Sequence, residues 1–367
     1  MHRSVAIMPA PILESLSVQT VLVPINPPHR TASGLVEKSP LVLIDLHCSN
    51  GLTGHAIVFT YTPAALKATA ELVLGLEALI VGQVLAPRAI NDFLLAKTRL
   101  IGSQGMVGTV IAGIDMAAWD ALARFHETSV CELLGGQPGA VPAYAGTGYD
   151  GEIETARQAE AWVKKGFKGV KAKIGYPTAA EDLAVIKAMR SAVGPDVELM
   201  VDYNQSLHPV DAIRRLQQLD DHGLLWIEEP VLAHDYANTA RIKDALNTPI
   251  QSGENWWGPA DMQLALTADA SDFVMPDVMK IGGVTGWMKA VDLAAAAGKQ
   301  VSSHLWPELS AQLLAVGSTS HQLEYVDWWA EILDEPLLVE NGVTVLPDDL
   351  RGSGMTWNSD KVDQYRV

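Results

Sequence analysis

Short apolar segments alternate with segments of helical periodicity over the second part of the chain. From residue 141 onward, eight apolar segments end in polar or turn-forming residues and have the length and composition of buried strands. They read VPAYAGTG, GVKAKIG, ELMVDYN, LLWIEEP, PIQSGE, DFVMPDV, QVSSHL and LEYVDW. The segments between them, such as IETARQAEAWVKKG, carry apolar residues at three- and four-residue spacing and end in glycine, as helices do. Eight strands joined by crossover helices predict a (β/α)8 barrel.

An open, doubly wound sheet is the alternative arrangement of such alternating elements. It would need a GxGxxG sequence directly after its first strand, and the chain has none in that context. We therefore expect a catalytic barrel over residues 137–332. Residues 333–367, with their prolines and short apolar runs, are expected to pack back on the first domain.

The residues before the barrel have a different pattern. Segments 6–24 and 41–60 have the composition of antiparallel strands, joined by the polar, turn-forming stretch PPHRTASGLVEKS. Helical patterns follow in TPAALKATAELVLGLEALIVG, in residues 90–100 and in GTVIAGIDMAAWDALARFHE. Together these elements predict an α+β domain over residues 1–136.

Charge and cysteine content limit the possible partners and the compartment. A net charge of -17 argues against nucleic acid and against an anionic membrane surface, although a metal and lysines could still attract a small anion locally. Cys48 and Cys131 cannot form a disulfide framework. The N-terminus has no continuous apolar segment long enough for a signal peptide, and no stretch of the chain has the length of a membrane span, so we expect a cytoplasmic protein.

Three carboxylates lie at the ends of three successive predicted strands. Asp202, Glu228 and Glu254 are separated by equal intervals of 26 residues, about one strand-helix unit, so they should converge on one rim of the barrel. A single such carboxylate more often caps a helix or joins an ion pair. Three together repel one another, and an oxygen-only set favours Mg²⁺, with Mn²⁺ possible. Asn204, on the same face as Asp202, could add a neutral contact.

Two lysines in the preceding strand point to the same side of it. Lys171 and Lys173 are one residue apart, and a random KxK is usually a solvated pair on an edge strand. Here the strand is apolar, so its alternation directs both side chains into the barrel, where a lysine without a partner is costly. A cationic neighbour and a metal would depress the pKa of Lys173, which could then act as a base. Lys171 could hold a substrate carboxylate.

Two later strands end in a potential acid-base pair. His304 alone would more often be a hydrogen-bonded core histidine, but Asp277 on the preceding strand could orient its ring and stabilise the imidazolium. Glu324, late in the eighth strand, could donate a proton or a short hydrogen bond to an enolate oxygen if burial keeps it protonated. A metal flanked by a lysine and a His-Asp pair suits proton transfer next to a carboxylate.

The motifs VKAKIG, VDYNQS, WIEEP, GEN, MPDVMKIGGVTGW and SSHL resemble those of the mandelate racemase group of the enolase superfamily. The resemblance extends to PLVLIDL at 40–46, YTPAALK at 61–67 and GIDMAAWDAL at 113–122. It implies an α+β capping domain on a modified (β/α)8 TIM barrel, usually in a homo-oligomer, with a metal-stabilised enolate intermediate.

The same resemblance implies a role for each candidate residue. Mg²⁺ would be held by Asp202, Glu228 and Glu254. Lys173 would be the base for one enantiomer, and His304 with Asp277 the base for the other. The remaining two are Lys171 as the carboxylate clamp and Glu324 as the electrophilic acid.

The capping loop departs from mandelate racemase, where small apolar residues line the phenyl pocket. Here it reads PPHRTASGLV and includes His29, Arg30 and Ser33. Val36 and Leu305 keep apolar character, Val326 replaces an expected leucine, and residues 145–147 read Ala-Gly-Thr in place of Asp-Ser-His. We expect Lys171, Asn204, His29, Val36 and Leu305 to contact the substrate.

Two enzymatic functions fit these residues. The first is racemisation of a 2-hydroxy acid, mandelate or a relative, in which one base removes the α-proton and the other returns it. The second is dehydration of a sugar acid, with His304 as the general acid that expels the 3-hydroxyl; His29 and Arg30 would suit its polarity. A third hypothesis, a barrel that binds a small carboxylic acid without turnover, predicts stabilisation by the ligand without α-proton exchange.

Overall fold

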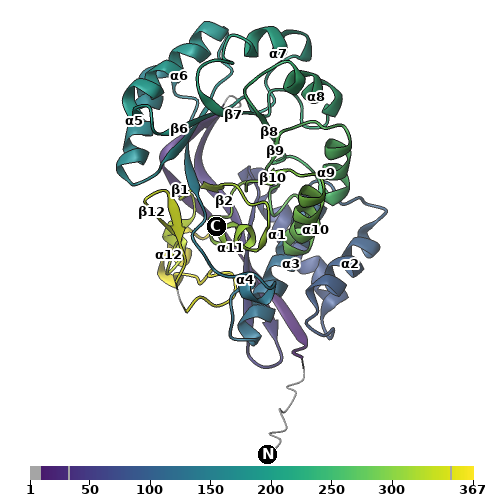
Figure 1. The fold of residues 1–367 in the computed structure, drawn as a ribbon. Helices are drawn as coiled ribbons and strands as arrows, with labels where there is room; N and C mark the ends of the chain where they lie inside the picture. The colour runs from purple at the N-terminus through teal and green to yellow at the C-terminus, as the bar shows by residue number, and fades with distance from the viewer. Residues whose placement is uncertain (1–9, 32–33, 348) are drawn as a thin grey trace, which may run out of the picture.

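The N-terminal sheet is a long antiparallel hairpin with a third strand beside it (Figure 1). The structure, a computed structural model, describes residues 10–31, 34–347 and 349–367. The strands are β1 (Leu13–Thr31), β2 (Gly34–Cys48) and β3 (Thr53–Phe59), in the order β1-β2-β3. The helices that follow are α1 (Pro63–Ile80), α2 (Pro87–Thr98), α3 (Met106–Phe125) and α4 (Val130–Leu133).

Two expectations for this sheet were wrong. The polar stretch after residue 24 is no loop, because β1 and β2 pair up to Thr31 and Gly34. The ladder is irregular at its start, between Leu13 and Ser15, and again between Pro24 and His29, where two prolines lack the N–H that a ladder needs. Segment 41–60 holds two strands separated by a turn, not one. The first residues of the segment predicted to begin at residue 6 lie outside the described part of the chain.

Eight parallel strands form the barrel and match the eight predicted segments. They are β4 (Ala143–Thr147), β5 (Gly169–Lys173), β6 (Glu198–Asp202), β7 (Leu224–Glu228), β8 (Ile250–Ser252), β9 (Phe273–Val274), β10 (Gln300–Val301) and β11 (Leu323–Tyr325). Their order is β10-β9-β8-β7-β6-β5-β4-β11, so the first and last strands pair. Backbone hydrogen bonds from His321 to Val301 (2.7 Å) and from Ser303 to Gln322 (3.0 Å) connect β10 to the start of β11. The predicted capped barrel is confirmed.

Helices surround the barrel, and the chain ends beside the N-terminal sheet. The outer helices are α5 (Gly151–Lys164), α6 (Ala179–Val193), α7 (Pro209–Leu216), α8 (Tyr236–Asp244), α9 (Gly258–Thr267), α10 (Gly283–Ala296) and α11 (Pro307–Val316). The last elements are η1 (Ala330–Ile332), β12 (Leu338–Glu340), β13 (Val343–Val345) and α12 (Ser359–Tyr365). Val367 N donates to Thr20 O (3.0 Å), and Trp357 Nε1 donates to Asp45 Oδ1 (2.6 Å). The domain boundaries at 136 and 332 stay predictions.

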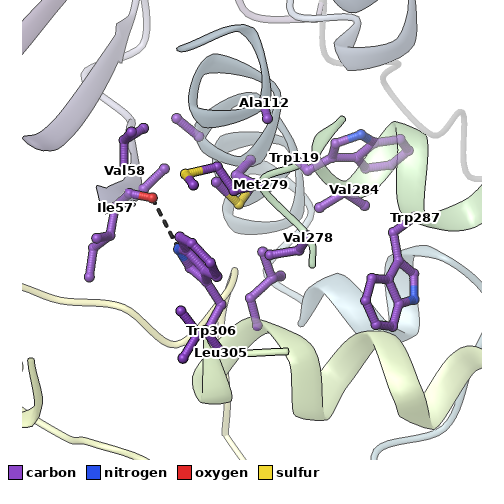
Figure 2. Packing of buried hydrophobic residues seen from close by; sticks show 14 of the residues in the cluster. Ile57, Val58, Ala112, Trp119, Val278, Met279, Val284, Trp287, Leu305 and Trp306 are labelled. Atoms are coloured by element: carbon purple, nitrogen blue, oxygen red, sulfur yellow. Dashed lines mark hydrogen bonds between the residues drawn. The ribbon is translucent and has the colours of Figure 1, made fainter. Parts of the chain in front are cut away.

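Two large hydrophobic cores support the barrel, beside a small cluster of Tyr144, Met200 and Trp226 on its own strands. One core, which we call the barrel core, consists of buried residues from α5–α8 and β5–β8, such as Ala172, Val201 and Ile227. The other, which we call the joint core, combines the N-terminal domain with α9–α11 and strands on the other side of the barrel. Figure 2 shows part of the joint core, where Trp306 Nε1 donates to Ile57 O of β3 (3.1 Å). The two sides of the barrel are therefore supported differently.

Helix α3 is the centre of the joint core and packs against α10. Its buried Asp115 accepts hydrogen bonds from Thr285 N (2.9 Å) and Thr285 Oγ1 (2.6 Å) in the first turn of α10. Gly283 makes this approach possible, because a Cβ atom there would lie 2.4 Å from Asp115 Oδ2. By length and composition α3 could cross a membrane, but 72% of its most apolar window is buried inside the molecule. Its apolar sequence is accounted for by this packing.

Candidate active site

Three buried carboxylates converge at the C-terminal rim of the barrel. Asp202 and Glu228 are the last residues of β6 and β7 and are register partners, and Glu254 follows β8 by two residues. Each offers an oxygen atom, and these oxygens lie within 4.8 Å of one another. The equal spacing in the sequence reflects one strand-helix unit per carboxylate, which brings successive strand ends to one rim.

The acidic triad of Asp202, Glu228 and Glu254 fits a hard divalent cation. Burial raises the pKa of Glu228 to about 8, although Lys171 lowers it, and the neighbouring carboxylates add to the increase. The ionised form of Glu228 is therefore unfavourable unless a further positive charge is present at the triad. Three carboxylates without nitrogen or sulfur ligands are typical of Mg²⁺ or Mn²⁺. The three residues would hold such an ion.

Lys171 lies in the middle of β5 with its ammonium inside the barrel. Its Nζ atom donates to Glu228 Oε1 and lies 2.8 Å from Glu324 Oε1, and the side chain is only 3% exposed. Burial opposes the charge, but Glu228 and Glu324 raise the pKa of Lys171 well above its usual value. Lys171 is therefore protonated at neutral pH, and its positive charge suits the binding of an anion.

Lys173 ends β5 and reaches the cavity. It donates to Asp202 Oδ2 (2.9 Å) and to Asn204 Oδ1 (2.8 Å). Burial by itself would lower the pKa of Lys173, but the Asp202 carboxylate raises it above its usual value. The expected depression of this pKa is thus not produced by the protein groups. A lowered pKa of Lys173 would require a cation bound to Asp202, because such a cation would neutralise the carboxylate that raises this pKa.

His304 and Asp277 form the expected pair. The backbones of the two residues bridge in parallel, and His304 Nδ1 lies 2.6 Å from Asp277 Oδ2. Asp277 is held in turn by the N–H groups of Met279 (2.8 Å) and Lys280 (2.9 Å). The other ring nitrogen, Nε2, lies 3.2 Å from Glu254 Oε2. Burial opposes the charged form, but Glu254 and Asp277 raise the pKa of His304 above its usual value.

Glu324 lies late in the last barrel strand, beside the ammonium of Lys171. It lies in β11, and its Oε2 accepts a hydrogen bond from Leu305 N (3.3 Å). Burial by itself would raise its pKa, but Lys171 and then His304 lower the pKa of Glu324 below its usual value. The neighbouring ammonium therefore favours the carboxylate form of Glu324, against the effect of burial on which the predicted acid role depends, and that role stays a prediction.

A cavity of about 610 Å³ connects these groups with the N-terminal domain. Strands and helices of that domain contribute His29, Val36, Phe59 and Tyr61 among others, and the barrel contributes Lys173, Asn204, Glu254, His304, Leu305 and Trp328 among others. Four residues predicted to contact the substrate line it, namely His29, Val36, Asn204 and Leu305. Lys171 lies beside it, in a narrower cavity of about 50 Å³.

The narrow cavity is built by the ends of the first and last barrel strands. Gly146 and Thr147 of β4 and Val326 line it, together with Lys171 and Glu324. Two of the residues at which we expect a departure from the mandelate racemase pattern, Gly146 and Thr147, therefore form part of a wall of this cavity.

Arg30 does not reach either cavity. Its Nε atom lies 3.5 Å from Asp150 Oδ1, and its side chain is half-exposed. Its carbonyl accepts from Tyr149 N (2.8 Å), so this end of the hairpin is attached to the loop after β4. The expectation that Arg30 suits a polar substrate was wrong, because Asp150 pairs with it outside the cavity. Ser33 lies outside the described residues.

Several cavity residues escaped the sequence analysis. Lys280 donates from Nζ to Asn255 Oδ1 (2.7 Å) and lies 4.7 Å from the ring centre of Tyr61. Asn255 Nδ2 in turn donates to Glu254 Oε1 (3.1 Å). Lys280 and Asn255 are close in sequence to Asp277 and Glu254, which could have drawn attention to them. Tyr61 carries no such signal because it comes from the other domain.

Two family models match the chain. The mandelate racemase / muconate lactonizing enzyme N-terminal domain matches residues 14–135, and the enolase C-terminal domain-like model matches residues 154–361. Together they include the strand ends that carry the acidic triad, the two lysines, the Asp277–His304 pair and Glu324.

Relatives of known structure or function are also similar over most of the chain. An enolase from Bradyrhizobium, solved with magnesium and mandelic acid, is 41% identical with a TM-score of 0.94 and covers 98% of this chain and 100% of its own. A racemase from Streptomyces coelicolor with bound magnesium is 27% identical with a TM-score of 0.91, covering 97% and 100%. The L-talarate/galactarate dehydratase of Salmonella typhimurium is 33% identical over 70% of this chain and 65% of its own length.

Proposed function

The chain belongs to the mandelate racemase and muconate lactonizing enzyme family of the enolase superfamily and is a magnesium-dependent enzyme, and we propose that it racemises a 2-hydroxy acid, mandelate or a relative. One observation carries the proposal. Lys173 contacts Asp202 at one end of the acidic triad, and His304 contacts Glu254 at the other. Two bases at opposite ends of one metal site are what removal and return of a proton on two faces of a carbon require.

The residues divide the reaction as follows. Lys173 removes the α-proton of one enantiomer, and His304, oriented by Asp277, returns a proton on the opposite face; the other enantiomer uses the reverse order. Lys171 pairs with the substrate carboxylate, and Asn204 orients the α-hydroxyl. Bound Mg²⁺ would withdraw electron density from the substrate and make the α-proton more acidic.

The apolar cavity wall supports a substrate with an apolar side chain. Val36, Phe59 and Leu305 lie on it beside the two bases. The Bradyrhizobium relative was solved with mandelic acid, a 2-hydroxy acid with a phenyl group. Both observations favour an aryl or alkyl 2-hydroxy acid.

Dehydration of a sugar acid is the second candidate. It is supported by the similarity to L-talarate/galactarate dehydratase and by a cavity large enough for a six-carbon acid. In this reaction Lys173 would remove the α-proton, and His304 would protonate the leaving 3-hydroxyl. Both functions share the first step.

Proton NMR in D2O separates the candidates. The magnesium-loaded protein is incubated with each mandelate enantiomer, and the α-proton signal and optical rotation are followed. Loss of the α-proton with loss of rotation supports racemisation. If 2-hydroxy acids show no α-proton exchange but sugar acids give a 2-keto product, the proposed racemisation is wrong and dehydration is the function. If the protein binds acids of both kinds but exchanges the α-proton of neither, it is a barrel that binds carboxylic acids without catalysis.

We also propose that the protein is a cytoplasmic homo-oligomer that binds neither nucleic acid nor membranes. The acidic composition supports the absence of these two partners. Light scattering coupled to gel filtration measures the number of subunits.

A further inference from the structure

One polar group of the cavity has no part in the chemistry described so far. The Nε2 atom of His29 is buried and has no hydrogen-bond partner among the described residues. Its ring packs on Trp328, with ring centres 5.0 Å apart. An unsatisfied buried nitrogen is costly, and in native proteins such a group commonly meets a ligand or water.

The position of His29 points to one part of the substrate. His29 is shared by both cavities, lining the large one with Lys173 and His304 and the narrow one with Lys171 and Glu324. The narrow cavity has open space at Gly146, another of its lining residues, because a Cβ atom there would meet no atom within 4 Å. Because His29 and Lys171 line the same narrow cavity, a carboxylate held there by Lys171 would lie next to the imidazole.

The charge of His29 suits this position. Burial, and then the positive charge of Lys173, lower the pKa of His29 to about 3, so the ring is neutral near neutral pH. A neutral imidazole has one N–H donor. It can donate to a carboxylate oxygen without adding a third cation beside Lys171 and Lys173.

We propose that the imidazole of His29 donates a hydrogen bond to the substrate carboxylate, so that the N-terminal domain takes part in holding the acid group together with Lys171. This inference rests on the proposed function for the identity of the acid group. It assigns the role to the ring and not to one nitrogen, because rotation of the ring by 180° exchanges nitrogen and carbon positions. The alternative partner is a hydroxyl on the substrate side chain.

Two variants and three ligands test the proposal. His29→Phe keeps an aromatic ring against Trp328 but removes both nitrogens, whereas His29→Gln keeps an N–H donor. Calorimetry measures binding of mandelate, lactate and glycerate to each magnesium-loaded protein. Because the lost hydrogen bond has a charged acceptor, we expect His29→Phe to weaken binding of all three acids by about 10- to 100-fold. His29→Gln should stay within about threefold of the natural protein.

The outcomes are distinct. Equal affinity of the Phe variant and the natural protein would overturn the proposal. A loss confined to glycerate, which alone carries a 3-hydroxyl, would overturn it in favour of a side-chain contact. Failure of the Gln variant to recover binding would also overturn it, since packing and not hydrogen bonding would then be the cause. Because binding is measured directly, a natural protein that binds the acids but shows no α-proton exchange refutes the racemase proposal separately.

Discussion

Each side of the barrel carries one of the two proposed bases, but the two sides pack on different hydrophobic cores. Lys173 lies between Ala172 and Ile174, which belong to the barrel core of α5–α8. His304 precedes Leu305 and Trp306, which belong to the joint core shared with the N-terminal domain. The position of Lys173 thus depends on the barrel alone, whereas the position of His304 depends on how two domains pack. Changes in the two cores should therefore affect the two directions of proton transfer unequally.

The largest effect is expected when either base is removed. Lys173→Ala should lower α-proton exchange from one enantiomer by about 10²- to 10⁴-fold, and His304→Asn should do so for the other. NMR in D2O with each pure enantiomer measures both rates, and the unaffected enantiomer is the internal control. Equal losses from both enantiomers in either variant would refute the two-base mechanism.

The second prediction concerns the acidic triad that joins the two sides. Asp202→Asn removes a ligand next to Lys173, and Glu254→Gln removes one next to His304. Each should weaken Mg²⁺ binding by about 100-fold or more, beyond what substitution of an outer-sphere partner costs. Calorimetric titration with Mg²⁺ gives the affinity, and Glu181→Gln in the exposed cap of α6 is the control. Unchanged affinity in either triad variant would contradict the assigned metal site.

A third prediction separates the two cores directly. Asp115→Ala leaves Thr285 without its acceptor at the joint, and Asp182→Ala removes the acceptor of Gly175 N and Tyr203 Oη in the barrel core. Each should lower the free energy of unfolding by about 1–3 kcal/mol. Urea denaturation measures the stability.

Exchange rates of the two enantiomers test the separation itself. Asp115→Ala should slow the His304-dependent direction more, and Asp182→Ala the Lys173-dependent direction. If both variants slow both directions equally, the two cores do not act independently.

The last prediction is a gradual one, a pH dependence of the stability of the joint core. Burial raises the pKa of Asp115 from 3.8 to about 7, so the folded state binds the proton more tightly than the unfolded state. The stabilisation is complete below pH 4 and is lost as the pH rises through 7. Between pH 5 and 7 the free energy of unfolding should fall with a contribution of up to about 1 kcal/mol per pH unit. Denaturation of the natural protein and of Asp115→Asn at several pH values should show a shallower slope for the variant.

The barrel and its strand-end residues could be predicted because a simple geometric rule applies to them. Parallel strands end on the same rim, so the chain positions of Asp202, Glu228 and Glu254 alone bring them together. The hairpin could not be predicted in the same way. Its outer part combines prolines and polar residues with two adjacent apolar residues, Leu35 and Val36, so no alternation distinguishes strand from loop. Only the pairing of β1 with β2 defines the strands there.

The protonation states of the site residues, and the cavity residues contributed by the N-terminal domain, could not be predicted from the sequence either. Whether Glu324 is charged depends on its 2.8 Å approach to Lys171, which no spacing reveals. Tyr61 reaches the cavity through the packing of two domains. These are contacts between elements far apart in the chain, and they depend on how the domains fit together.

The fit of Gly283 against Asp115 has a consequence for recombination between relatives. Any side chain at position 283 would collide with the carboxylate on α3, so the two positions must be inherited as a compatible pair. A chimaera that exchanges the N-terminal domain alone would need glycine at 283 in the recipient barrel. The barrel core, formed by β5–β8 and α5–α8, contains no residue of α3. The segment from β5 to β8 is therefore free of this constraint, and the corresponding segment of a relative could replace it as a single block.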